Sequence, residues 1–546
     1  MITKKRGIFP AFIHKGKRKM TEEAIVKDVI LKNSKGEYLI PYTGGSSGGS
    51  SSGGLPPSIC KSVRINIDGT SVSLKWQDPQ NTILDKQYLC TWAGTKIVKK
   101  LGSYPENEND GTLVVDNTVM GQYSENAYID TITAGEDWKY CAFPYSTNGV
   151  YCYNKSNRFM EAVIYEFTVN PNDSNPATRV QYPVGCTNEN YDFAHMDFST
   201  GAWSWGDWSK DNFFVPRPCM LKIVNGVTSF QYYLYEHNYA YRADGVTLSD
   251  VANVSENWQA MLEWGQVWIK FSLDGTLWHI YVSNVEVDED YKCYTHRNAN
   301  GVLVDNIYTM IYQPSNVNST LRSISGKGIM TNTSGVTMQT YAQNNGAGWD
   351  FMSYGQWIMI EVLTTLITKS TNVEARIGCG RYSSANNTTG ECNTDGYFFG
   401  TNGNGRIKMW GAENLIANYW KPVNGCNYST STGLMYKLSE DTSDGTTVVG
   451  YNASSNGYKS AGLISGSSGG YISQMTLNAD GIFPKVVSGS ATTYFCDGCW
   501  FANGTFGRVG GSYANGSLDG VFTVVVDNAL SNAYANYGAS LSYVPR

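Results

Sequence analysis

Thr505-Phe506-Gly507-Arg508-Val509-Gly510-Gly511-Ser512-Tyr513 is the most diagnostic stretch of this 546-residue chain. A run rich in Gly, Asn and Ser follows it as far as Leu541. About a hundred residues upstream lies a second stretch, which begins Trp410-Gly411-Ala412-Glu413-Asn414 and ends Tyr419-Trp420-Lys421-Pro422-Val423-Asn424-Gly425. Together the two stretches read Gly-x-Glu-Asn, Trp and Gly, followed by Arg-Val-Gly-Gly-Ser and an aromatic residue.

This combination resembles the C-type-lectin-like fold, in the branch shared by formylglycine-generating enzyme and phage tropism determinants. In that branch a compact, loop-rich scaffold presents a variable binding face, so the resemblance implies recognition of a surface rather than chemistry. Formylglycine-generating enzyme depends on cysteines close to its C-terminus. No Cys follows Cys499 here, so the resemblance does not extend to that activity, and we expect no enzyme.

The composition favours a multidomain, mainly β protein. Charged residues make up only 16%, while the chain contains 57 Gly and 38 Tyr. Such a composition is typical of β-rich extracellular or virion proteins with many tight turns. It is too aromatic for a disordered chain, and the length suggests three or four domains.

Residues 1–43 form a basic segment, with ten Lys or Arg against four Asp or Glu, although the whole chain has a net charge of -6. Two strand-like runs, at 24–31 and 37–41, predict a hairpin that needs a partner or an oligomer, since a lone hairpin is marginal in water. The segment resembles the N-terminal attachment segments of phage fibre proteins, although a solvated terminus has the same composition. Residues 44–54 are Gly and Ser only, which predicts a flexible linker, natural or engineered.

Residues 55–170 resemble a fibronectin type III domain, a β-sandwich. Val72-Ser73-Leu74-Lys75-Trp76 alternates as a half-buried strand does, and Trp138 to Tyr145 gives a later strand. We expect Trp76 and Tyr140 to be core aromatics of the two sheets. Such domains in phage fibres act mainly as spacers.

A polar connector with two prolines, Asn170 to Pro176, precedes residues 180–546, which read as one large unit. The helical spacing of Trp357, Ile360 and Ile367 predicts a helix over Tyr354 to Thr368 with one buried face. A helix ahead of the Gly-x-Glu-Asn segment agrees with a C-type-lectin-like α+β head.

Cofactor and metal chemistry is not indicated. The twelve Cys lack a regular framework and read mostly as reduced, buried small hydrophobes. Cys496 and Cys499 form a Cys-x-x-Cys, but no second pair or nearby His completes a zinc site. Glycan cleavage needs two placed carboxylates, and the candidates, namely Asp288, Glu289, Asp290 and Glu361, show no pairing. We also expect no nucleic acid partner and no membrane insertion.

The candidate binding face lies in the last fifty residues. Aromatics give a large contact area at low entropy cost, and Ser, Gly and Asn give adaptable hydrogen bonds. The expected ligand-binding residues alternate with small residues after Gly510-Gly511, and they are Tyr513, Asn515, Tyr534, Asn536 and Tyr537. Trp500 and Phe506 are the foremost core alternatives, and we expect Trp410 and Trp420 to be structural.

These features predict a bacteriophage fibre protein on the virion surface, attached to the head or the tail. It is expected to be a homotrimer, anchored to a capsid or tail protein through residues 1–43. Its C-terminal head would bind a bacterial surface glycan or protein. Two alternatives remain at this point, a surface-polysaccharide depolymerase and a purely structural capsid or tail decoration.

Overall fold

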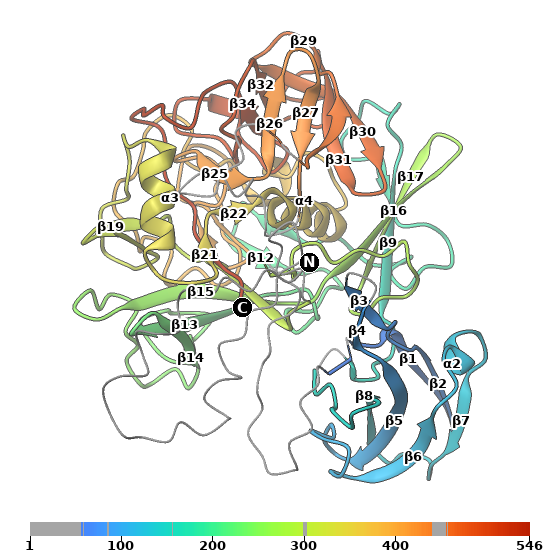
Figure 1. Ribbon diagram of the computed structural model, residues 1–546. Coiled ribbons are helices and arrows are strands. Elements are labelled where there is room, and N and C mark those ends of the chain that lie inside the picture. The colour runs from blue at the N-terminus through green and yellow to red at the C-terminus, as the bar shows by residue number, and fades with distance from the viewer. Residues whose placement is uncertain are drawn as a thin grey trace. The chain divides into compact units, whose positions relative to one another are not determined.

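The computed structural model describes residues 56–545, except for residues 58, 85–86, 155–156, 299–302, 439–454 and 456. The expected basic segment (1–43), its hairpin and the Gly/Ser linker (44–54) lie outside these residues. The described chain is mainly β and divides into two compact units between Ala162 and Val163 (Figure 1).

The first unit consists of two three-stranded sheets that enclose one core. One sheet has the order β1 (Lys61–Asp68), β2 (Ser71–Gln77), β7 (Tyr128–Thr131), and the other β6 (Thr112–Asn117), β5 (Trp92–Leu101), β8 (Trp138–Ser146). A hairpin of β3 (Thr82–Leu84) and β4 (Gln87–Cys90) and a short helix, α2 (Gln122–Glu125), complete the unit. The alternation in β2 buries Val72, Leu74 and Trp76 completely. Trp76 and Tyr140 share this core, as expected from the sequence.

The boundary between the units lies earlier than the expected domain end at residue 170. Strand β9 (Ile164–Val169) pairs with β17 (Leu277–Ser283), deep in the second unit. The polar segment Asn170 to Pro176 connects β9 to its neighbour β10 (Val180–Gln181). It is therefore a hairpin loop, and its Asn, Asp and Pro residues suit a loop as well as they suit a domain linker.

The second unit contains three larger sheets. The six-stranded sheet has the order β14 (Val227–Tyr233), β13 (Arg217–Val224), β15 (Trp258–Gly265), β18 (Asn306–Met310), β35 (Ser542–Tyr543), β21 (Trp349–Asp350). The eight-stranded sheet has the order β22 (Met352–Ser353), β25 (Lys421–Asn424), β33 (Arg508–Val509), β34 (Val524–Val526), β32 (Gly498–Phe501), β30 (Gly470–Asn478), β31 (Gly481–Val487), β29 (Ser465–Gly466). The four-stranded sheet has the order β10, β9, β17, β16 (Trp268–Asp274).

The second unit also contains smaller elements. Short pairs are β11 (His195–Asp197) with β12 (Ala202–Ser204), β19 (Ser315–Val317) with β20 (Thr320–Arg322), and β23 (Lys408–Met409) with β24 (Ala412–Glu413). A three-stranded sheet joins β26 (Cys426–Ser429), β27 (Gly433–Tyr436) and β28 (Lys459–Gly462). The helices are α3 (Gly335–Gln343), α4 (Tyr354–Thr368), α5 (Glu374–Ile377) and the 3-10 turn η2 (Gly516–Leu518).

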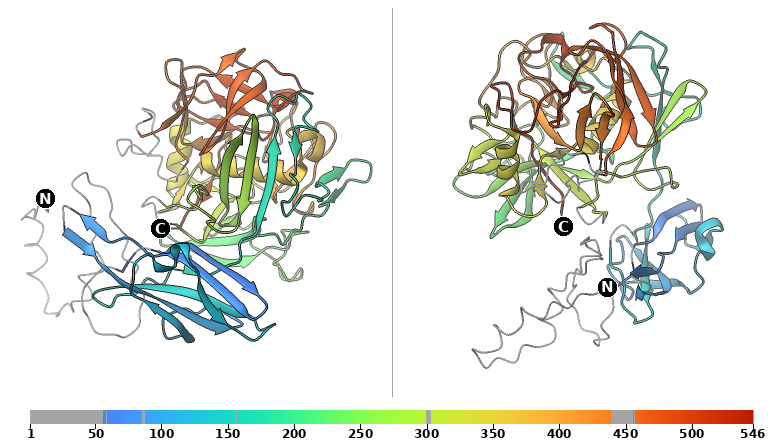
Figure 2. Two further views of the ribbon diagram at one scale, coloured as in Figure 1. Left: turned by 90° about the vertical axis from the view of Figure 1, so that its right-hand side faces the viewer. Right: turned by 45° about the horizontal axis from the view of Figure 1, so that its top comes forward.

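Helix α4 is the centre of the second unit and lies between its six-stranded and eight-stranded sheets (Figures 1 and 2). It has the bounds that the spacing of Trp357, Ile360 and Ile367 predicts. All fifteen of its residues are buried, so the burial extends beyond the single face expected. The other faces of the helix are apolar as well, at Ile358, Met359 and Val362. A helix that is hydrophobic on all sides is typical of a protein core.

Two features fix the N-terminal part of α4. Ser353 caps the helix: its side chain accepts from the backbone N–H of Gln356, and the Gln356 side chain accepts from the backbone N–H of Ser353. The Trp357 indole N–H donates to the Val521 carbonyl at 2.7 Å. The helix is thereby tied to the chain segment that precedes β34.

We predict that Ser353→Ala lowers the free energy of unfolding of the second unit by about 1–2 kcal/mol, because it removes a buried capping box. Chemical denaturation of the full chain measures this loss. Ser467→Ala, at an exposed serine, is the control and should change stability by less than about 0.5 kcal/mol. Equal stability of the two variants would show that the cap is dispensable.

Candidate functional site

The two diagnostic sequence stretches lie side by side. Strand β25 pairs with β33, so that Lys421 faces Val509 and Pro422 faces Arg508. Gly510 and Gly511 follow with φ angles of 78° and 89°, a conformation that glycine adopts without strain. At Gly511 a Cβ atom would collide with the Asp519 carboxyl group. The glycines thus turn the chain out of the sheet and into the loop that carries Tyr513.

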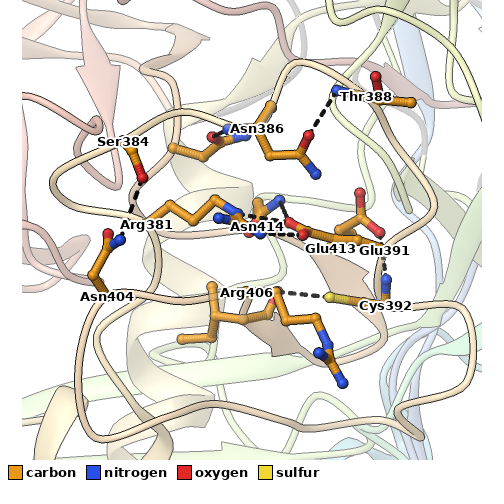
Figure 3. A network of polar contacts seen from close by, with 12 residues as sticks. Arg381, Ser384, Asn386, Thr388, Glu391, Cys392, Asn404, Arg406, Glu413 and Asn414 are labelled. Atoms are coloured by element: carbon orange, nitrogen blue, oxygen red, sulfur yellow. Dashed lines mark hydrogen bonds and ion pairs between the residues drawn. The ribbon is translucent and has the colours of Figure 1, made fainter.

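The Gly-x-Glu-Asn segment forms hydrogen bonds with a second loop, between Arg381 and Cys392. The Glu413 carboxylate accepts backbone N–H groups of Gly390 at 3.0 Å and of Cys392 at 2.8 Å. The Asn414 side chain donates to Glu391 at 2.9 Å, and Glu391 forms a two-contact ion pair with Arg381. Figure 3 shows these side chains pointing toward one another. Both motif residues therefore fix the loop between Arg381 and Cys392.

Burial shifts the pKa values of the charged groups in this network. It raises the pKa of Glu413 to about 7, although the N–H donors of Cys392 and Gly390 act in the opposite direction. Burial also lowers the pKa of Lys408 to about 8, and the Lys408 ammonium donates to the Cys392 carbonyl at 2.8 Å. For Glu391, burial acts to raise the pKa, but hydrogen bonds from Arg381 and Asn414 outweigh it and the pKa is lowered.

Asn418 joins the loop after Arg381 to the loop that carries Tyr513. Its backbone N–H donates to the Arg381 carbonyl at 3.0 Å, and its backbone carbonyl accepts from the Tyr513 backbone N–H at 2.9 Å. Its side-chain oxygen accepts from the Asn386 backbone at 2.9 Å. Asn418 is fully buried and has a φ of 58°, which Asn tolerates better than most residues. One buried residue thus contacts both loops, the first through its backbone N–H and side chain and the second through its backbone carbonyl.

We call the surface above these contacts the loop face, formed by residues 381–388, 402–405, 512–518 and 532–536. The Asn404 side chain accepts the backbone N–H groups of Tyr382 and Ser383 at 2.9 and 3.0 Å. The Asn536 side chain lies 3.4 Å from the Ser512 hydroxyl. The accessible side chains of the loop face include aromatic, hydroxyl and amide groups, at Tyr382, Ser383, Ser384, Asn404, Tyr513, Asn515, Ser517, Tyr534 and Asn536.

The structure separates the five residues expected to bind a ligand. Tyr513, Asn515 and Asn536 are half-buried members of the loop face, and Tyr534 is 48% exposed. Tyr537 is only 2% exposed, so the expectation that it lines the outer face is corrected. Alternation with small residues in the sequence therefore does not predict whether a side chain is exposed or buried.

Tyr537 is a core residue. Its ring contacts the Phe506 ring edge-on at 5.8 Å, and the Arg508 guanidinium lies 4.2 Å from its centroid. Trp410, Trp420 and Phe506 are also buried, whereas Trp500 is half-buried against Trp420.

Sequence reasoning missed Tyr382, Ser384, Asn404 and Asn418. The run Tyr382-Ser383-Ser384-Ala385-Asn386-Asn387 has the same Tyr, Ser and Asn composition as the last fifty residues, so that signal was present. Its proximity to Tyr513 depends on hydrogen bonds between segments far apart in the sequence, and no local pattern encodes it.

The carboxylates considered for glycan cleavage lie in different surroundings. Asp288 and Asp290 both pair with Lys270, at 3.0 and 3.2 Å. Glu361 lies within α4 and lines a cavity of about 10 Å³, which is room for about one water molecule. A buried helix position beside so small a cavity has no space for a sugar.

The Cys-x-x-Cys has a structural explanation. All twelve cysteines are free, and Cys496 and Cys499 are both buried. Asp497 between them accepts the Phe522 backbone N–H at 2.7 Å. Among the described residues, no group of three or more His, Cys, Asp or Glu is placed to hold a metal ion. Within the same residues, no helix has the length and apolar character needed to cross a membrane.

The chain matches no protein-family model, and it has no match among curated proteins.

We predict that Tyr537→Ala destabilises the second unit by roughly 3 kcal/mol or more, because it empties a buried aromatic site beside Phe506. Tyr534→Ala, at the exposed neighbour, should cost less than about 1 kcal/mol. Thermal unfolding of the two variants distinguishes these positions. Similar losses in both would contradict the burial described for Tyr537.

We also predict that Glu413→Gln reduces the pH dependence of stability. Folded Glu413 keeps its proton up to about pH 7, whereas the unfolded side chain loses it near its ordinary value of 4.5. The stabilisation from Glu413 is therefore present below pH 4.5 and is lost as the pH rises through 7, a change of about 3 kcal/mol. Lys408 is present in both proteins, and its lowered pKa gives the opposite dependence, at pH values above about 8.

Denaturant unfolding at pH values from 4 to 8 measures this difference. The wild-type protein should lose more stability over this interval than Glu413→Gln. Parallel curves for the two proteins would mean that Glu413 is already ionised at low pH in the folded state.

Proposed function

We propose that this protein is a bacteriophage fibre protein that binds a bacterial surface receptor through the loop face of its second unit, without catalysing a reaction. The observation that carries the proposal is the construction of the loop face. Buried polar contacts from Asn418, Glu413 and Asn414 hold the loops, and Tyr, Ser and Asn side chains remain at the surface. Rigid aromatics with adaptable polar neighbours are the chemistry of binding surfaces.

The fold gives this proposal further support. A C-type-lectin-like assignment of the second unit is favoured by the pairing of β25 with β33 and by the helix that precedes the Gly-x-Glu-Asn segment. A fibronectin type III-like assignment of the first unit is favoured by the facing sheets β1-β2-β7 and β6-β5-β8. In this proposal the first unit is a spacer and residues 1–43 attach the protein to a capsid or tail protein.

Homotrimer formation belongs to the same proposal. Several weakly binding loop faces on one particle gain avidity when they act together. Light scattering of the purified full chain, alone and with its capsid or tail partner, measures the assembly state.

Two rival functions are separated by one experiment. The purified full chain is mixed with bacterial cells, and adsorbed protein and released glycan fragments are measured in parallel. Adsorption without fragments supports the proposal, and fragment release supports a depolymerase. If the protein neither adsorbs to the cells nor releases fragments, the remaining explanation is a purely structural decoration.

We predict that Tyr513→Ala weakens adsorption by about tenfold or more while the melting temperature stays nearly unchanged. Truncation of an aromatic anchor at a binding hot spot costs roughly 2 kcal/mol, and Tyr513 is half-buried against Tyr419 at the edge of the face. Phe230→Ala, at a 42% exposed position on β14, is the matched control. Equal adsorption by both variants would exclude the loop face.

A further inference from the structure

The first unit carries a row of three tyrosines on the outer face of its β6-β5-β8 sheet. Tyr145, on β8, forms a bridge to Tyr151, and their ring centroids lie 5.2 Å apart. The Tyr153 ring follows at 6.1 Å from Tyr151 and is nearly parallel to it, at 19°. Tyr153 is 51% exposed. We call these three residues the tyrosine row.

The position of the row on the sheet follows from strand alternation. Tyr140 and Ala142 of β8 face the core between the sheets, so Tyr145 faces away from it. On β5, Ile97 faces the same core, so Lys96 lies on the outer face with Tyr145. Asp116 is the cross-strand partner of Lys96 and shares that face.

A glycine in the strand makes room for the first ring. Gly94 on β5 stands opposite Tyr145 in the sheet register, and a Cβ atom at Gly94 would collide with the phenol of Tyr145. The ring therefore lies across β5 and reaches β6, where its hydroxyl donates to Asp116 at 2.9 Å. A glycine inside a strand often marks such a close approach.

Charged groups line the row on both sides. The Tyr153 hydroxyl donates to Glu108 at 2.9 Å. The Lys96 ammonium lies 5.4 Å from the Tyr151 ring centroid and 5.9 Å from that of Tyr145. The rings are held in place by these contacts, and Asp116 is exposed to solvent beside them.

We propose that the tyrosine row is a binding site for a neutral glycan chain, separate from the loop face of the second unit. One face of a sugar ring consists of C–H groups and packs on an aromatic ring, while hydroxyls project from its rim. Asp116 and Glu108 accept hydrogen bonds from such hydroxyls, and Lys96 donates to them. Two carboxylates beside one ammonium disfavour an acidic sugar.

The hydrogen bonding of the row favours a glycan over a proline-rich peptide. Such peptides also dock on aromatic surfaces, but their unpaired carbonyls require hydrogen-bond donors. The Tyr145 and Tyr153 hydroxyls already donate to Asp116 and Glu108. The polar groups around the row are therefore mainly acceptors, which match hydroxyl groups.

The test is retention of the full chain in native gels that contain neutral polysaccharides (a glucan, a mannan, a galactan or a soluble chitin derivative), with alginate as the acidic contrast. Wild type should be retarded by at least one neutral polysaccharide. Tyr153→Ala should lower that affinity about tenfold, and Glu108→Gln should also lower it while preserving every ring. Ile129→Ala, at a 58% exposed position on β7 of the other sheet, and Tyr513→Ala on the loop face should both bind as wild type does.

Several results would overturn the proposal. These are no retardation by any neutral polysaccharide, retardation by alginate alone, equal binding by Tyr153→Ala and Ile129→Ala, or binding only to a polyproline peptide. Loss of binding in Tyr513→Ala with full binding in Tyr153→Ala would assign the glycan to the loop face instead.

Discussion

The second unit depends on the complete burial of α4. Fifteen consecutive buried residues supply the apolar surface on which both large sheets pack, and the capping box satisfies the backbone groups at the start of the helix. The Trp410 indole, fully buried, donates to Thr364 of α4 at 2.9 Å. Trp410 directly precedes the Gly-x-Glu-Asn segment, so the helix positions Glu413 and Asn414. Those two residues in turn hold the loop from Arg381 to Cys392.

The same physical arrangement recurs on the loop face and the tyrosine row. In each, a polar contact fixes the backbone or the ring, and an aromatic side chain remains accessible; the contact is part-buried on the loop face and exposed on the tyrosine row. On the loop face the fixing group is an amide, Asn418. On the first unit the fixing groups are the carboxylates Asp116 and Glu108. Rings that are already ordered lose little conformational freedom on binding, which lowers the cost of association.

Local patterns in the sequence were sufficient for the elements with strong periodicity. The bounds of α4 and the core positions of Trp76 and Tyr140 follow from spacing alone, because burial repeats with the period of the element. The diagnostic stretches around Trp410 and Arg508 also indicated which distant segments belong together. The end of the first domain was misplaced because a hairpin loop at Asn170 has the composition of a linker.

The candidate site was only partly predictable for a related reason. Tyr513 and Asn515 were found from composition, but Tyr537 shares that composition and lies in the core. Tyr382 and Asn404 were missed because their place on the loop face depends on the hydrogen bonds of Asn418. These bonds connect segments far apart in the sequence. Contacts made by one buried residue, Asn418, leave no periodic pattern in the sequence.

The central claim is that the loop face contacts the receptor surface. Amide hydrogen exchange of the full chain, with and without envelope fragments of a bacterium to which the protein adsorbs, tests it most directly. The account predicts slower exchange on binding in residues 381–388 and 512–518, with exchange in β14 unchanged. Protection confined to β14 or to other surfaces of the second unit, with none in these loops, would contradict it.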